Sequence, residues 1–475
     1  MANNHKRPIW QNLRIPIPLN NRLIELSEQK IIKGNATLYN CLYIISSITS
    51  NQKKKYRDYK TFRSVPSSRF KSMIGEAYNK PLNLLLDNGI LERSGKAFPA
   101  FTNDNGKRLE SECYKYRIHP DLTDSEESVK VKFKYTERTP TYKEFNRQRE
   151  YREQFIKDFN LLDIPFMELY KAVEDHVNSL KIDNYEVNER MYWKSGYKDV
   201  HEIDSTYVEL PPVRMSLNEA LLYADQKNMV LFSSGGKIKM MYESMYMEDQ
   251  RAFVRNSWLE AIDNLKEGNL YAKRKNRLYS NFTNFPKKLL EIIKKRNNLG
   301  ESDVKSSQPA FLAYLLDKEG IRSHDINEFQ RLVNESDIYL HFAKDGMSRG
   351  EAKTMMFKIL FSKPTSTFQD VEIFRNEFPN VMGYIDDFKT KEGNQYNDFA
   401  IMLQTIESEV FIDGIYPKLR ALNIPFFTKH DSIIYNRKDA DIVQKVMHDH
   451  FIEIGFRGQL DHEYKLNEQP KIKIA

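Results

Sequence analysis

The chain has 475 residues, of which 40% are hydrophobic and 12% aromatic, a composition typical of a globular protein with two or three domains. Only Cys41 and Cys113 are present and no apolar run of about 18 residues occurs, which excludes a disulfide framework, a cysteine-rich zinc site and a membrane-spanning helix. The start also lacks the apolar stretch of a signal peptide, so we expect a soluble cytoplasmic protein without membrane contact.

The net charge of +7 is concentrated toward the N-terminus. Residues 1–120 contain 21 Lys and Arg against 9 Asp and Glu, whereas residues 121–475 contain 52 against 57. A basic domain beside a larger and nearly neutral one suggests a domain that binds nucleic acid. A solvated lysine-rich surface is the alternative explanation.

The basic segment has the pattern of helices followed by a hairpin. Residues 20–49 predict one helix or two, and the basic sequence KKKYRDYK follows at 53–60. Residues 65–98 predict two helices joined by a tight turn and then a strand, and the alternating residues 113–118 complete a hairpin. This order resembles winged-helix domains, in which one helix enters the major groove of DNA. The resemblance implies that residues 1–120 bind a specific DNA site, while the alternative is a winged helix that binds only protein.

The middle of the chain predicts a linker and then helices. Residues 121–160 alternate acidic, basic and polar side chains, so we expect a linker that buries little and, from Tyr142, a long exposed helix. Residues 161–180 and 251–268 have the period of amphipathic helices. We therefore expect a helical region over 161–270.

Two aspartates in the C-terminal part lie in short apolar segments that predict strands. Asp303 is found in SDVKSSQPAF and Asp431 in PFFTKHDSIIY. Carboxylates on adjacent strands can hold a pair of Mg²⁺ ions, which is the core of a nucleotidyl-transfer site. Taken singly, an aspartate in such a segment is more often a turn or cap residue.

A cationic and aromatic face is expected on the segment between these aspartates. Arg349, Lys353, Phe357 and Phe361 recur every four residues, which places them on one face of a helix. The cations suit a triphosphate, and a ring can stack on a base. Each residue alone is more typical of a solvated face or a core, but the order carboxylate, cationic-aromatic helix, carboxylate indicates a polymerase palm and fingers.

Five segments resemble, in order, the motifs of family A DNA polymerases, the group that includes bacterial polymerase I and its phage relatives. NRLYSNFTNFP (276–286) is similar to the RLSSxxPNLQ segment, and SDVKSSQPAF (302–311) to the first palm motif, DYSQIELR. SRGEAKTMMFKILF (348–361) resembles the finger-helix motif RxxAKxxNFGxxYG. LQTIESEV (403–410) is similar to the family's Gln-containing segment, and KHDSI (429–433) to the last palm motif, VHDEL. The likeness covers about a third of the chain.

The resemblance implies a two-metal catalytic site and a primer-template site. Asp303 and Asp431 are expected to ligate two Mg²⁺ ions, with the backbone carbonyl of Val304 completing the shell. The residues expected to contact the primer-template are Arg277, Asn284, Gln404 and His430.

The resemblance also implies how a nucleoside triphosphate is bound. Arg349 and Lys353 are expected to hold the phosphates, with Lys353 also acting in catalysis as a proton donor, and Phe357 to pack against the sugar and base. Gln308 stands where the family has a glutamate that blocks a ribose 2′-hydroxyl, so the choice of sugar stays open. Ser432 stands where the last motif has another glutamate, so this site has one carboxylate fewer.

The sequence therefore predicts an α+β protein with a winged-helix domain (1–120), a linker and exposed helix (121–160), a helical thumb-like region (161–270) and a right-hand polymerase palm, built on an antiparallel sheet, with compact helical fingers (271–475). The favoured function is a DNA-directed DNA polymerase of a phage or mobile element, without a proofreading exonuclease, acting in a bacterial or phage-infected cell. One alternative is an RNA polymerase or primase with the same site. Another is a non-catalytic DNA-binding initiator or regulator.

Overall fold

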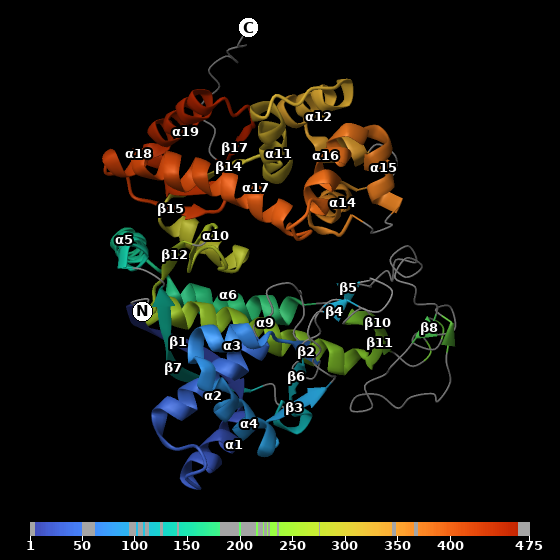
Figure 1. The fold of residues 1–475 in the computed structure, drawn as a ribbon. Coiled ribbons are helices and arrows are strands. Elements are labelled where there is room, and N and C mark those ends of the chain that lie inside the picture. The colour runs from blue at the N-terminus through green and yellow to red at the C-terminus, as the bar shows by residue number, and fades with distance from the viewer. Residues whose placement is uncertain are drawn as a thin grey trace. The chain divides into compact units, whose positions relative to one another are not determined.

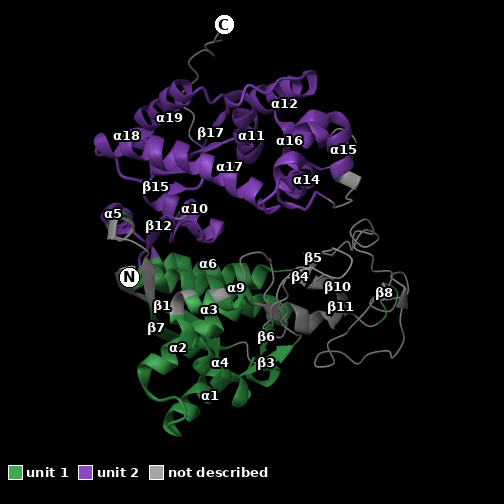
Figure 2. Ribbon diagram, in the orientation of Figure 1, with its two compact units in different colours: residues 1–147, 166–269 green, residues 148–165, 270–475 purple. Residues whose placement is uncertain are grey.

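Helices dominate the chain and its sheets are small and antiparallel, so the fold class is α+β as predicted (Figure 1). The chain divides into two compact units, residues 1–147 with 166–269 and residues 148–165 with 270–475 (Figure 2). The computed structural model describes residues 5–49, 62–94, 101–102, 108–109, 114–123, 127–139, 142–180, 199–200, 215–216, 222, 226, 229–234, 237–274, 276–343, 348–364 and 369–463.

The first unit joins the N-terminal region to the helices that follow the predicted linker, so the chain is grouped differently from the four predicted segments. Its described elements are β1 (His5–Pro16), α1 (Ile17–Glu28), α2 (Gly34–Thr49), β2 (Arg63–Ser64), α3 (Ser67–Ile74), η1 (Glu76–Tyr78), α4 (Asn79–Asp87), β3 (Leu91–Ser94), β4 (Phe101–Thr102), β5 (Arg108–Leu109), β6 (Lys115–Ile118), η2 (Pro120–Leu122), β7 (Ser128–Thr139), α6 (Phe166–Ser179), β8 (Asp199–Val200), β9 (Met215–Ser216), β10 (Met229–Ser234), β11 (Lys237–Tyr242) and α9 (Glu243–Lys266). A further helix, α5 (Tyr142–Phe159), begins in this unit and continues into the second.

The segment predicted as a linker forms part of a long antiparallel ribbon, which corrects that prediction. Strand β7 pairs along its whole length with β1, and Phe133 at its centre is fully buried. The physical reason is the alternation in VKVKFKY (129–135), which gives the strand one apolar face between exposed lysines. The following helix α5 is also not exposed throughout, because Phe155 and Phe159 are buried.

Helices α2, α3 and α4 and strands β2, β3 and β6 form a small helical layer and a three-stranded sheet. Strand β6 lies between β2 and β3 and pairs antiparallel with both, so the predicted hairpin of β3 and β6 is confirmed. The stretch 20–49 contains two helices, α1 and α2, which share a core with Phe70, Leu85 and Ile118.

The second unit contains the predicted catalytic segments. Its described elements after α5 are β12 (Ala272–Arg274), β13 (Leu278–Ser280), α10 (Lys287–Arg296), β14 (Leu299–Val304), α11 (Ser307–Lys318), α12 (His324–Glu335), α13 (Ile338–Phe342), α14 (Arg349–Phe361), α15 (Gln369–Glu377), α16 (Pro379–Thr390), α17 (Asp398–Ser408), the π-helical η4 (Glu409–Ile415), α18 (Tyr416–Ala421), β15 (Phe426–Lys429), β16 (Ser432–Asn436), η5 (Arg437–Asp439), α19 (Ala440–Ile454) and β17 (Leu460–His462). Four of the strands form an antiparallel sheet in the order β15-β16-β14-β17.

Two cores hold this unit together. Beside the sheet, Phe427 packs with Phe155 and Phe282 at ring-centroid distances of 5.6 and 4.8 Å. The helices α12 to α16 form a second cluster, in which Phe378 packs on Phe329 and Phe374. The first core fixes the sheet, and the second supports helix α14.

Candidate functional site

A tight turn between β15 and β16 brings the two predicted catalytic aspartates together. Lys429 pairs with Ser432, so the loop consists of His430 and Asp431 alone. Ser432 also pairs with Asp303 on β14, and the carbonyl of Asp431 accepts a hydrogen bond from the amide of Val304 at 3.1 Å. Asp303 and Asp431 therefore lie at the same end of adjacent strands, as predicted.

A third aspartate joins them from the other side of β14. Asp461 on β17 is the register partner of Asp303. Asp303 is exposed, yet nearby protein atoms partly desolvate its carboxylate. This desolvation, followed by repulsion from Asp431, Glu301 and Asp461, raises the pKa of Asp303 to about 6. We call Asp303, Asp431 and Asp461 the acidic cluster. The sequence motifs missed Asp461, which lies in a three-residue strand with no motif around it.

Helix α14 has the predicted exposed face. A capping box starts the helix, since Ser348 accepts from the amide of Glu351 and Glu351 accepts from the amide of Ser348. The four predicted side chains, Arg349, Lys353, Phe357 and Phe361, are all exposed. At the other end, the buried amino group of Lys389 donates to the carbonyls of Ile359 and Ser362, at 2.6 and 2.8 Å. Both ends of α14 are therefore fixed.

The first turn of α14 lies close to the acidic cluster. Arg349 forms an ion pair with Asp337 at 3.0 Å and lies 5.2 Å from the ring centre of Tyr339. Burial raises the pKa of Tyr339 to about 12; Arg349 opposes this shift, while Asp337 and Asp431 add to it. The charges of both Arg349 and Asp431 therefore act on the Tyr339 hydroxyl, and Lys353 follows one turn further along the helix.

The residues expected at the primer-template lie on two neighbouring segments. Asn276 donates to Gln404 at 2.6 Å, and Arg277 forms an ion pair with Glu407, one turn beyond Gln404 on α17. Gln308, which is buried, donates to the same glutamate at 3.0 Å. The structure therefore joins Arg277 and Gln308 through Glu407, a residue that the sequence motifs did not single out, and Gln404 is tied to the same segment through Asn276.

His430 and Asn284 differ in their surroundings. His430 has a φ of +59°, and its ring packs on Tyr279 at 5.4 Å. Burial lowers its pKa to about 4, with Arg277 and Lys429 contributing, so the ring is neutral at pH 7. Asn284 lies in an exposed turn after β13, and we assign it no contact with the other predicted residues.

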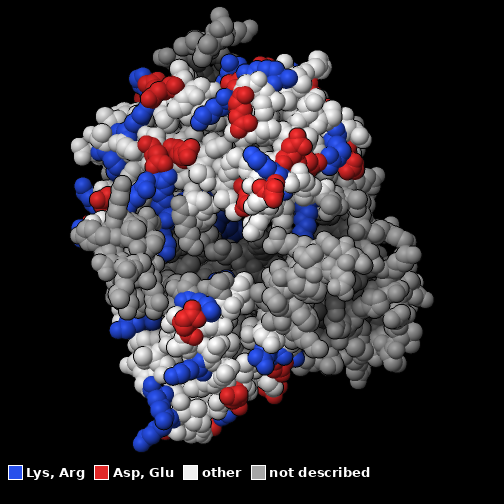
Figure 3. All heavy atoms as spheres, viewed as in Figure 1, with Lys and Arg blue, Asp and Glu red and all other residues white. Residues whose placement is uncertain are grey.

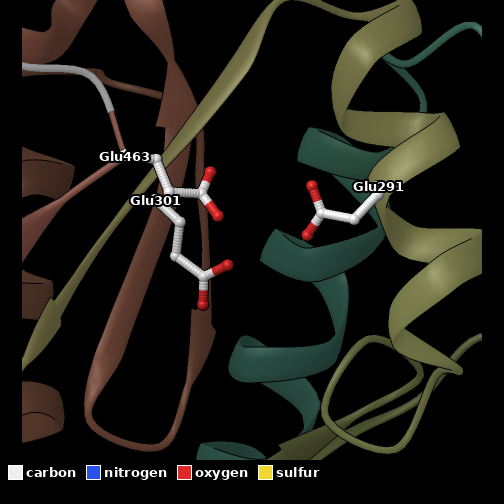
Figure 4. A group of neighbouring side chains, drawn as sticks. All are labelled: Glu291, Glu301 and Glu463. Carbon is white, nitrogen blue, oxygen red and sulfur yellow. The ribbon is translucent and has the colours of Figure 1, made fainter.

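A second acidic group, which we call the glutamate group, lies beside the sheet. Glu291, Glu301 and Glu463 have carboxylate oxygens within 4.8 Å of one another, and Figure 4 shows Glu291 on its helix facing the other two. The ammonium of Lys294 lies among them, 3.0 Å from Glu301 and 3.4 Å from Glu291. The ammonium of Lys294 therefore occupies the position among the carboxylates that a metal ion would take and offsets part of their charge, so this group is not the candidate catalytic metal site.

The acidic cluster has the donor chemistry that Mg²⁺ prefers. Its side chains offer carboxylate oxygens, although the carboxylates of these three described residues do not all lie within 4.8 Å of one another, as those of the glutamate group do. The pKa of Asp303 is raised first by desolvation and then by neighbouring negative charges that a cation would offset. Within the described part of the chain, no helix is both long and apolar enough to cross a membrane. Comparison of the sequence with protein-family models and with curated proteins found no match.

Proposed function

We propose that the protein is a template-directed nucleotidyltransferase, specifically a DNA-directed DNA polymerase with a family-A-like palm and fingers. The observation that carries the proposal is the acidic cluster, built around Asp303 on β14 and Asp431 in the turn that leads into the adjacent antiparallel strand β16. Helix α14 supports it, because its cationic first turn lies close to that cluster. Apart from Asp461, the residues of both features belong to the segments that resemble the family's motifs.

In this proposal, Asp303 and Asp431 would hold Mg²⁺, with Asp461 beside them, and the metal would supply Lewis-acid activation of the primer hydroxyl and charge neutralisation at the leaving pyrophosphate. Arg349 offers a planar fork for phosphate oxygens once it leaves Asp337, and Lys353 adds a point charge. The exposed rings on the same helix face give a surface on which a base can stack.

Replacing Lys353 tests the nucleotide-binding part of the proposal. We expect Lys353→Ala to lower kcat/KM for a single dNTP by about 100-fold, because a phosphate contact that strengthens in the transition state is worth a few kcal/mol. Lys438→Ala is the control. This exposed lysine comes after the last residue of β16, whereas Asp303 pairs with the first residue of that strand. Single-nucleotide incorporation measures both, and equal rates for the two variants would exclude Lys353 from the phosphate site.

The N-terminal region supports a DNA-binding role in the same proposal. Helices α2, α3 and α4 are interleaved with β2, β3 and β6, and the sheet order β2-β6-β3 places the last strand between the other two. Helices followed by a two-stranded hairpin are the order on which the winged-helix resemblance rests. Helix α4 would then be the helix that enters the major groove.

The basic stretch at 53–60 is a separate candidate for binding to phosphates, and it lies outside the described residues. On the face drawn in Figure 3, Lys and Arg of the described residues are interspersed with Asp and Glu. We expect replacement of Lys53, Lys54 and Lys55 by alanine to reduce the slope of log Kd against log salt by about one for each phosphate that is no longer neutralised. Fluorescence anisotropy of duplex DNA at several salt concentrations measures the slope, and an unchanged slope would remove this stretch from the interface.

RNA synthesis is the second candidate function. Gln308 is buried and hydrogen-bonded to Glu407, so a glutamine at this position does not by itself decide between deoxyribose and ribose. Parallel incorporation of dNTPs and NTPs separates the two polymerase functions. A DNA-binding regulator without catalysis is separated from both by the absence of any incorporation.

A further inference from the structure

One buried carboxylate holds two of the predicted substrate-binding residues. The same oxygen of Glu407, Oε2, accepts from Arg277 Nη2 at 2.5 Å and from Gln308 Nε2 at 3.0 Å. The Glu407 side chain is only 1% exposed. Arg277 comes from the segment before β13, Gln308 from α11 and Glu407 from α17, so the carboxylate joins three elements of the second unit.

Arg277 and Gln308 each have a further buried polar atom that makes no hydrogen bond within the described part of the chain. Among the described residues, Gln308 Oε1 and Arg277 Nε are buried and have no hydrogen-bond partner. The hydrogen bond to Glu407 is therefore what fixes the amide of Gln308, and the ion pair with Glu407 fixes the tip of Arg277. Removal of that acceptor would free both side chains.

Keeping a carboxylate at this position is energetically costly. Burial raises the pKa of Glu407 to about 8; Arg277 opposes the shift, and Asp431 adds to it by repulsion. The influence of Asp431 shows that Glu407 lies near the acidic cluster. A buried charge beside a candidate site often has a role in that site, although structural ion pairs are also perturbed.

We propose that Glu407 is a positioning residue that orients Arg277 toward the primer-template and Gln308 over the sugar of the incoming nucleotide. The inference rests on the proposed polymerase function. It makes the glutamate on α17, together with Gln308 on α11, the element that sets sugar choice. Glu407 thereby supplies the carboxylate that the first palm motif lacks at position 308.

Two substitutions separate the two roles. The assays are run above pH 8, so that the wild-type Glu407 is ionised despite its raised pKa. Under these conditions Glu407→Gln keeps an acceptor for the Gln308 amide but removes the charge that binds Arg277. We expect this variant to raise the Kd for primer-template by about tenfold with little change in the ratio of dNTP to NTP incorporation, because about 1.4 kcal/mol corresponds to a factor of ten. Glu407→Ala removes both interactions, so we expect it to weaken primer-template binding and also to lower that ratio by about tenfold.

A matched control is another ion pair of this unit that involves a buried carboxylate. Asp158, with a side chain 3% exposed, pairs with Arg420 at 2.5 Å. We expect Asp158→Asn to lower stability, measured by urea unfolding, without changing primer-template Kd or sugar choice. The Arg277→Ala variant completes the series, because once Arg277 is absent, Glu407→Gln should have no further effect on primer-template Kd.

The outcomes distinguish the inference from the function on which it rests. Wild-type extension with unchanged Kd and sugar ratio in Glu407→Ala overturns the inference alone. The same changes in Asp158→Asn would also overturn it, because they would reflect general destabilisation. A wild-type protein that incorporates no nucleotide overturns the proposed function and this inference with it. If Glu407→Ala does not fold, the primer-template Kd of Glu407→Gln, Arg277→Ala and the double variant tests whether Glu407 positions Arg277. A further increase in Kd when Glu407→Gln is added to Arg277→Ala would overturn that role.

Discussion

Asp303→Asn is expected to abolish nucleotide incorporation while making the metal-free protein more stable. Removal of a metal-binding carboxylate should reduce incorporation by about 10³-fold or more. At the same time, the substitution removes one of three crowded negative charges, whose repulsion contributes to the raised pKa of Asp303. We expect the unfolding free energy at pH 7 to increase by about 1 kcal/mol. This is less than the free energy to which the whole pKa shift would correspond, because solvent screens the charge of this exposed side chain.

Urea unfolding with and without Mg²⁺ measures the stability part of this prediction. Mg²⁺ should stabilise the wild-type protein by binding to the folded state, and it should stabilise Asp303→Asn much less. Asp441→Asn, at an exposed position on α19, is the control and should respond to Mg²⁺ like the wild type. A variant that keeps its Mg²⁺ response, or that still incorporates nucleotides, would contradict the assignment of Asp303.

Lys294→Met is expected to cause the largest decrease in stability. The side chain of Lys294 is 3% exposed and pairs with Glu291, Glu301 and Glu463. Burial alone would lower the pKa of Lys294. The carboxylates of Glu463 and Glu301 raise it by more than burial lowers it, so the lysine stays charged. Removal of the ammonium leaves the three glutamates with Lys429, 3.9 Å from Glu301, as a more distant cation. We expect a decrease of about 3 kcal/mol in unfolding free energy.

The control for this substitution is the next residue along the helix. Lys295 is exposed, so Lys295→Met should change stability by less than about 0.5 kcal/mol. In Lys294→Met, the glutamate group should bind a divalent cation in place of the ammonium, so millimolar Ca²⁺ should restore part of the stability. Equal urea midpoints for wild type and Lys294→Met would show that the lysine does not neutralise the group.

The parts of the site that the sequence predicted are those set by local periodicity and short motifs. The four-residue spacing from Arg349 to Phe361 gives an exposed helix face, and the S-x-x-E pattern of Ser348 and Glu351 starts that helix. The apolar runs around Asp303 and Asp431 gave strands in the right places. These features depend on residues within a few positions of one another.

The parts that the sequence did not reveal depend on contacts between distant segments. Asp461 becomes part of the acidic cluster only because β17 pairs with β14, and Glu407 matters only because α17 meets Arg277 and Gln308. The ribbon over 128–139 is a different case. Its alternation was present in the sequence, but the lysines between its apolar residues suggested a solvated linker instead.

The measurement that tests the central claim most directly is extension of a labelled DNA primer on a DNA template with Mg²⁺. Wild-type protein and Asp431→Asn are compared, with dNTPs and NTPs in parallel reactions. We predict extension by the wild type with dNTPs and none by the variant, because Asp431 is needed to hold the metal ions beside Asp303. Absence of extension with either nucleotide, on primed and unprimed templates, would contradict the polymerase function and favour a DNA-binding regulator.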